Sequence, residues 1–120
     1  MKGLYVHEAR LRMDVAASDP AAPGAAITVA LCGHWEHPPP CPLAAHHTGF
    51  SRDGDTVVLR VVFATAATDE GEVRRRIDGA LALGALAVPD GGTARWILLA
   101  AGPAQLSPEE AEHASRIAGT

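Results

Sequence analysis

Apolar and polar residues alternate along the first part of the chain, which is the pattern of a half-buried β-strand. Residues 4–15 settle into this alternation, with charged side chains between the apolar residues Ala9, Leu11, Met13 and Val15. A second alternation covers residues 26–36. The segment between the two, residues 18–24, contains two prolines and a glycine, which favour a turn. We therefore expect residues 4–15 and 26–36 to form an antiparallel hairpin.

The middle of the sequence predicts a third strand and a helix. Residues 56–65 are rich in β-branched side chains, and an Asp-Gly-Asp turn at residues 53–55 comes directly before them. Asp69 can cap a helix that ends near Gly84. The apolar residues of this helix recur at helical spacing, and they are Val73, Ile77, Ala80 and Leu81.

The last part of the chain predicts one more strand and one more helix. A turn at residues 90–92 leads to an apolar strand at residues 94–101. Ser107 and Glu110 have the spacing of a capping box, and a proline follows Ser107, so a short helix should run from Ser107 to Ile117.

The order β-β-β-α-β-α predicts an α+β fold in a single domain over residues 1–120. The simplest arrangement is one four-stranded, mostly antiparallel sheet with two helices on one face. A ferredoxin-like variant, which requires a helix between the first two strands, is the alternative.

The charge balance excludes some classes of partner. The 120 residues include 10 Lys and Arg against 14 Asp and Glu, for a net charge of −4. The one basic run, residues 74–76, lies on a predicted helix, where its three side chains would point in different directions. Because they would form no basic stripe, we expect no binding to nucleic acid. The chain has neither a signal-peptide pattern nor an apolar stretch of about 18 residues, which predicts a cytoplasmic protein outside the membrane. The high content of Ala, Arg and Gly is typical of a GC-rich bacterial genome.

Both cysteines and four of the six histidines lie in one short segment, residues 32–47. In the cytoplasm, two cysteines are more often thiols or metal ligands than a disulfide. On an extended strand Cys32 and His34 would project from the same face, about 6–7 Å apart. The stiff prolines at residues 38–40 lower the entropy lost when their neighbours bind one ion. This segment, which overlaps an irregular region expected at residues 37–52, therefore predicts a metal site.

Thiolate and imidazole ligands together favour Zn²⁺, with Cu(I) as the second choice. Six residues compete for about four coordination positions. The first choices are Cys32, His34, Cys41 and His46, and the alternates are His37 and His47. Four protein ligands would make the ion structural, whereas three and a water would make it catalytic, with Glu36 as the nearest carboxylate. The sequence leaves both open, and His7 of the first strand could complete either site.

Other classes of function are consistent with the same segment. The prolines at residues 38–40 and Trp35 could present a rigid ridge to a protein partner, without any metal. A metal-free enzyme or accessory domain could use Cys41 or His46 as its reactive group. A Cys32–Cys41 redox pair is a further alternative. The sequence identifies neither a substrate nor a reaction.

A sheet with helices on one face predicts self-association, because its other face needs a cover. Several apolar residues are expected on that open face: Val58, Val62, Ile97 and Leu99. We therefore expect a homodimer that packs through the open face of the sheet.

Overall fold

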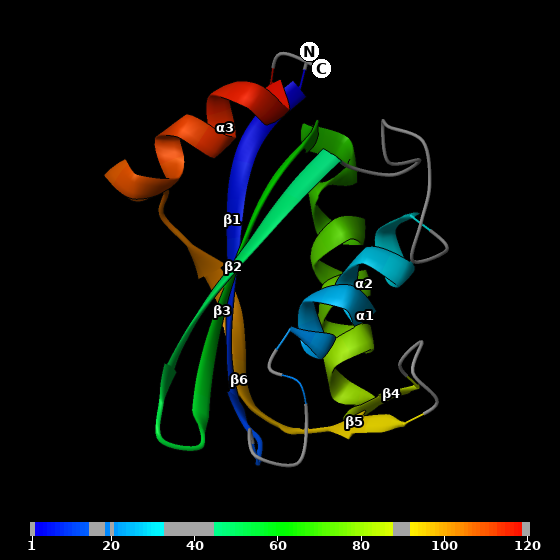
Figure 1. Ribbon diagram of the computed structural model, residues 1–120. Helices are drawn as coiled ribbons and strands as arrows, with labels where there is room; N and C mark the ends of the chain where they lie inside the picture. Colours follow the sequence, from blue (N-terminus) through cyan, green and yellow to red (C-terminus); the bar gives the residue numbers. More distant parts are fainter. Residues whose placement is uncertain (1, 15–18, 20, 33–44, 88–91, 119–120) are drawn as a thin grey trace.

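The fold is a four-stranded antiparallel sheet with helices on both faces (Figure 1). The computed structural model describes residues 2–14, 19, 21–32, 45–87 and 92–118. Its strands are β1 (Lys2–Arg12), β2 (Ala45–Asp53), β3 (Thr56–Ala66), β4 (Ala85–Ala87), β5 (Thr93–Arg95) and β6 (Ile97–Ala104). Its α-helices are α1 (Ala22–Cys32), α2 (Glu70–Ala82) and α3 (Ala111–Ala118), with short 3-10 turns at Ala67–Asp69 and Pro108–Glu110.

The predicted α+β fold, with one four-stranded antiparallel sheet and two helices packed on one face, is confirmed, and the topology is that of the ferredoxin-like alternative. The sheet has the order β2-β3-β1-β6, and β4 and β5 form a separate small hairpin. Without that hairpin and α3, the chain order is β-α-β-β-α-β. Since β3 is antiparallel to both β1 and β2, these two strands run in the same direction on either side of it. This is the split β-α-β arrangement, and the predicted order β-β-β-α-β-α is wrong.

The predicted strand at residues 26–36, and with it the predicted first hairpin, is wrong because α1 occupies most of this segment. Asp19 accepts a hydrogen bond from the backbone of Ala21 just before the helix, and Pro23 lies in the first turn, where a missing N–H costs nothing. The buried residues of its hydrophobic stripe recur at helical spacing, and they are Ala22, Ala26, Ile27 and Leu31. Like the other helices of the described residues, α1 is not long and apolar enough to cross a membrane.

Part of the region expected to be irregular, residues 37–52, is a strand. β2 pairs with β3 over its whole length, and the predicted turn at residues 53–55 joins the two strands. The register pairs Asp53 with Thr56, so the loop has only two residues, and Gly54 has a φ of 62° there. A left-handed conformation of this kind suits glycine in a tight hairpin turn.

Alternate residues of β1 and β3 build two separate apolar clusters. Odd-numbered side chains such as Leu11 and Phe63 pack with α1 and α2 in the main core. Even-numbered side chains on the opposite face, Val6 and Val62, pack against Ala114 of α3. The final helix was expected beside α2, and that placement is wrong, since α3 crosses the upper part of the other face (Figure 1). Val62 is therefore buried within the chain, and the predicted homodimer through this face stays a prediction.

The predicted helix after Asp69 is confirmed as α2, with its four predicted apolar residues buried. Gly84 follows the helix with a φ of 70°, and a Cβ there would lie 2.9 Å from the carbonyl oxygen of Trp96. The Trp96 indole donates a hydrogen bond of 2.8 Å to the carbonyl of Leu81, which fixes the ring in the core. A glycine at position 84 therefore lets the end of α2 turn sharply against the backbone of Trp96.

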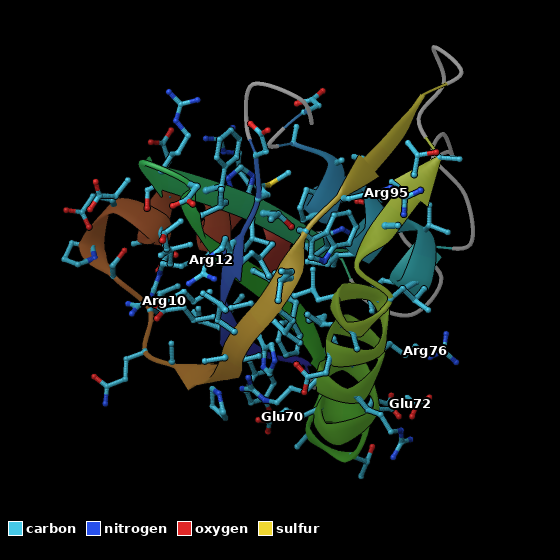
Figure 2. All side chains as sticks on the ribbon, turned by 90° about the horizontal axis from the view of Figure 1, so that it is seen from below. Arg10, Arg12, Glu70, Glu72, Arg76 and Arg95 are labelled. Atoms are coloured by element: carbon cyan, nitrogen blue, oxygen red, sulfur yellow. The ribbon has the colours of Figure 1, made fainter. Side chains whose placement is uncertain are left out.

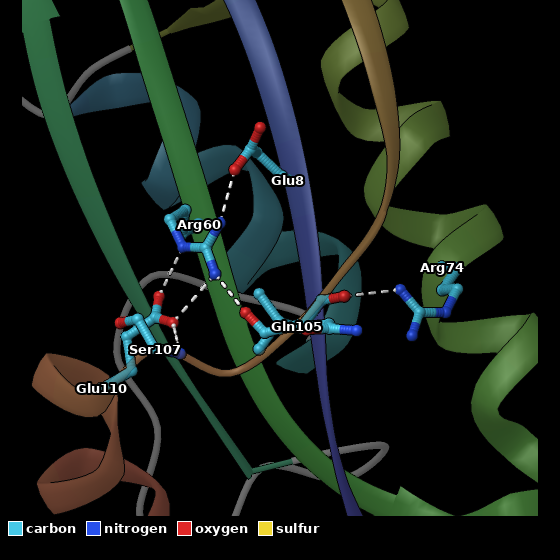
Figure 3. A network of polar contacts seen from close by, with 7 residues as sticks. Glu8, Arg60, Arg74, Gln105, Ser107 and Glu110 are labelled. Carbon is cyan, nitrogen blue, oxygen red and sulfur yellow. Dashed lines mark hydrogen bonds and ion pairs between the residues drawn. The ribbon is translucent and has the colours of Figure 1, made fainter.

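Arg60 of β3 holds α3 against the sheet (Figure 3). Its Nε donates to Glu110 Oε2 at 2.8 Å, and its Nη groups donate to Glu8 and to the carbonyl of Gln105. Glu110 also accepts a hydrogen bond of 2.9 Å from the backbone N–H of Ser107, as the predicted capping box requires. The hydrogen bonds from Arg60 are the main cause that lowers the pKa of Glu110 to about 2.

We predict that Glu110→Gln weakens this clamp while it keeps a side chain able to cap the helix. At neutral pH the free energy of unfolding should fall by about 1–2 kcal/mol, because a charge-assisted hydrogen bond is lost. The stabilisation by a carboxylate with a lowered pKa is complete above its ordinary value of 4.5 and disappears as the pH falls toward 2. Urea unfolding should thus show the two proteins converging over that interval.

The matched control is Glu112→Gln in α3, two residues further along the chain. Glu112 pairs only with the exposed Arg116 among the described residues, so its loss should change stability by less than about 0.5 kcal/mol. Equal effects of the two substitutions would contradict the assigned role of Arg60.

Candidate functional site

The six predicted metal ligands belong to the end of α1, the start of β2 and the segment between them. Cys32 is the last residue of α1, and His46 and His47 are the second and third residues of β2. The other three, His34, His37 and Cys41, lie outside the described residues, as does the side chain of Cys32. Within the described residues, no group of three or more His, Cys, Asp or Glu side chains could hold a metal ion.

The contact between Thr28 and His46 joins α1 to β2. The Nε2 of His46 lies 3.2 Å from Oγ1 of Thr28. The Thr28 hydroxyl has one proton, which it donates to the carbonyl of Gly24 one turn earlier, also at 3.2 Å. Oγ1 is therefore the acceptor toward His46, whose Nε2 carries the proton. In this tautomer Nδ1 bears the lone pair that a metal ion requires.

The α1 backbone places Cys32 near the same contact. Cys32 follows Thr28 by four residues in a continuous helix, so the two Cα atoms lie one turn and about 6 Å apart along the axis. Since Thr28 touches the ring of His46, the Cys32 backbone lies one helical turn along α1 from that contact. Two of the four first-choice ligands therefore belong to the two elements that meet at Thr28 and His46, although 14 positions separate them in the sequence.

The two adjacent histidines of β2 face opposite sides of the sheet. His46 pairs in register with Phe63, which belongs to the core under α1 and α2. His47 pairs with Val62, which belongs to the cluster under α3. The register therefore favours His46 over His47 for an ion beside α1, although His47 also borders the cavity there.

A small cavity of about 300 Å³ adjoins this junction. Its wall includes Thr28, His46 and Thr48, and half-exposed Phe50 stands at its edge. The hydroxyl of Thr48 is buried and has no hydrogen-bond partner in the described part of the chain. The cavity thus combines an imidazole and two hydroxyls with an apolar rim, and it has room for a water molecule or a small ligand.

His7 lies elsewhere and cannot complete this site, because α2 engages both of its ring nitrogens. The side chain is only 2% exposed, and its Nε2 lies 2.7 Å from Oδ1 of Asp78. Its Nδ1 lies 3.0 Å from Nη1 of Arg74, which can only donate. Nδ1 is therefore the acceptor and the Nε2–H donates to Asp78. The possibility that His7 joins the cysteines and histidines of residues 32–47 is wrong.

Arg74 differs from its two neighbours in the basic run at residues 74–76. Its side chain is only 14% exposed and donates to the carbonyl of Val6 and to Glu70, each at 2.8 Å. Its guanidinium also lies over the ring of Phe63, 5.3 Å from the centroid. The other two arginines of the run are exposed and pair with Glu72. Unlike its two neighbours, Arg74 is therefore not a solvated side chain of the helix, and it ties α2 to β1.

A larger cavity of about 770 Å³ lies at the opposite end of the sheet from α3. Trp96 and Met13 contribute buried apolar surface to its wall, and Arg12 and Arg95 contribute charged groups. The remaining wall residues are Asp14, Asp55, Gly84 and Ile97. None of the predicted metal ligands lies in this wall.

Two residues that shape these sites carry little signal in the sequence. Thr28 was part of a predicted strand, and only the helical structure of α1 places it one turn from Cys32. Asp78 contacts His7 across 71 positions. Contacts between residues so far apart depend on the topology of the fold, and the predicted order of helices and strands gave the wrong topology.

No protein-family model matches the chain, and neither a curated protein nor a solved structure matches it.

We predict that Asp78→Ala lowers the free energy of unfolding by about 1–3 kcal/mol, because the Nε2–H of buried His7 loses its acceptor. Asp78→Asn should lose less, since the amide oxygen can still accept this hydrogen bond. Chemical denaturation of the two variants measures the difference. Wild-type stability in both would show that the contact with His7 contributes nothing.

Proposed function

We propose that this protein binds one zinc ion where the end of α1 meets the start of β2. The ligands come from Cys32, His34, Cys41 and His46, with His37 and His47 as alternates. Cu(I) is the second candidate metal, because it accepts the same soft ligands. His46 is favoured over His47, because it lies on the α1 side of the sheet.

The observation that supports this proposal is the contact of Thr28 with His46. It brings together the two elements that border the cysteine- and histidine-rich segment, and it leaves His46 in a tautomer that can ligate through Nδ1. A histidine that binds a metal ion through one ring nitrogen commonly donates the N–H of the other to an oxygen acceptor, which orients the imidazole. The Thr28 hydroxyl has this role toward His46.

The fold also lowers the cost of closing the site. In an unfolded chain the ends of the segment must be brought together at an entropic cost, whereas in the fold α1 and β2, which carry Cys32 and His46, already meet at the Thr28–His46 contact. Metal binding would then stabilise the folded state, because an organised set of ligands exists only there.

The cavity beside His46 favours an ion with one open coordination position. With three protein ligands, a water molecule or a small substrate could occupy the fourth position and extend into this space. Zinc would lower the pKa of such a water and so supply a nucleophile. A fully ligated structural ion is the other form of the same proposal.

The alternatives to metal binding stay predictions. The proline ridge with Trp35 and the reactive Cys41 belong to residues 33–44, which lie outside the described residues. Within the described residues, no observation favours either of them over a metal site.

We predict about one zinc ion per chain in protein purified without a histidine tag, measured by elemental analysis. The variant Cys32→Ser/Cys41→Ser should retain well under half of this, and His46→Gln should also lose metal. His113→Gln is the matched control, because α3 lies on the other face of the sheet. Wild-type protein that remains metal-free after incubation with zinc would refute the proposal, as would equal metal loss in the control.

The orienting role of Thr28 is tested separately. Thr28→Val keeps the shape of the side chain but removes the acceptor for His46, so zinc affinity should fall by about 10–100-fold in a competition titration with a chelating dye. Thr48→Val removes a hydroxyl of the same cavity that has no hydrogen-bond partner in the described part of the chain, and it should leave the affinity unchanged. The reverse order of effects would contradict the assigned tautomer.

A further inference from the structure

The part of the sheet that α3 leaves uncovered carries two adjacent arginines. Arg10 and Arg12 are two residues apart on β1, so both project from the same face as Val6. α3 covers this face at Val6, whereas both arginines are exposed. Figure 2 shows the two side chains close together on the side of the sheet away from α2.

Within the described residues, Arg10 and Arg12 have no acidic partner, a property that they share with Arg52 but not with most of the other arginines. Five arginines form ion pairs with glutamates, and they are Arg60, Arg74, Arg75, Arg76 and Arg116. Within the described residues, neither Arg10 nor Arg12 has an ion pair or a side-chain hydrogen bond. This is notable in a chain with a net charge of −4, where acidic side chains outnumber basic ones.

Apolar surface and two hollows surround the pair. Ile97 and Leu99 of the edge strand β6 are 59% and 44% exposed. Arg12 and Ile97 border the cavity of about 770 Å³. Arg10 borders a hollow of about 290 Å³ whose wall is completed by the small residues of β6 from Ala100 to Pro103 and by Glu8, which pairs with Arg60. The face therefore places two cationic groups beside hollows that have both apolar and acidic walls, since Asp14 and Asp55 line the larger one.

We propose that this face binds an extended acidic segment of a partner protein. Alternate side chains of an extended strand lie about 6.6–6.8 Å apart on one face, which is also the spacing of the positions of Arg10 and Arg12. Two carboxylates at positions i and i+2 of the partner can thus reach both guanidinium groups. Apolar side chains of the same segment enter the hollows beside them.

Charge complementarity favours this occupant over a second copy of the chain. A second copy that packed the same face against itself would bring four unpaired guanidinium groups into one interface, which is unfavourable. A single small anion would engage the arginines but leave Ile97 and Leu99 exposed. An acidic and apolar strand satisfies both features.

The test is fluorescence anisotropy with a labelled peptide of alternating Glu and Val, measured against the full-length protein. The peptide should bind, and binding should weaken as salt is raised. Arg10→Gln/Arg12→Gln should reduce the affinity by about tenfold or more, because two charge contacts are lost. Arg52→Gln, at an exposed arginine near the end of β2, is the matched control and should bind as the wild type does.

Several outcomes would overturn the proposal. One is the absence of binding at millimolar peptide, and another is equal binding of a Gln-Val peptide with the same spacing. An unchanged affinity in the double variant, or an equal loss in Arg52→Gln, would show that Arg10 and Arg12 are not the contact. A dimer seen by light scattering that the double substitution abolishes would assign the face to a second copy. Displacement of the peptide by low concentrations of inorganic phosphate would assign it to a small anion.

Discussion

The structure depends on the pairing of β1 with β3 at the centre of the sheet. The two strands pair along all of β1, and their alternating side chains divide the interior into two clusters. The odd-numbered side chains are buried by α1 and α2, and the even-numbered side chains Val6 and Val62 are buried by α3. Because the side-chain period of a strand is two residues, a shift of one position would exchange these faces. The register of this pair therefore determines where every helix lies.

The same pairing creates the candidate metal site. β2 joins the free edge of β3 and runs in the direction of β1, so the chain must cross the sheet between β1 and β2. α1 makes this crossing, and the segment with both cysteines connects its end to the start of β2. The Thr28–His46 contact lies at that connection. A topology with residues 26–36 as a strand beside β1 would have separated Thr28 from His46.

Local patterns predicted β1, the β2–β3 turn, β3, α2 and the capping of the last helix, because each depends on neighbouring residues. The error at α1 has a local cause as well: the apolar residues Ile27, Val29 and Leu31 fit period two, and they fit a helix rich in alanine equally well. The strand nature of β2 was hidden by histidines and a glycine, and pairing with β3 stabilises it. The placement of α3 depends on Arg60 and Glu110, which meet across 50 positions.

For the candidate site, the cluster of cysteines and histidines could be read from the sequence, but the selection among its members could not. The opposite faces of His46 and His47 follow from the register of β2, and the exclusion of His7 follows from its contacts with Arg74 and Asp78. These choices between candidate ligands can be made only from the fold, because each depends on contacts between residues that are distant in the chain.

X-ray absorption spectroscopy at the zinc edge of the purified protein tests the central claim most directly, because it reports the ligands themselves. The account predicts a sulfur shell at about 2.3 Å together with a nitrogen shell at about 2.0 Å, from cysteine and histidine on one ion. A spectrum with only nitrogen and oxygen neighbours, or protein that binds no zinc, would contradict it.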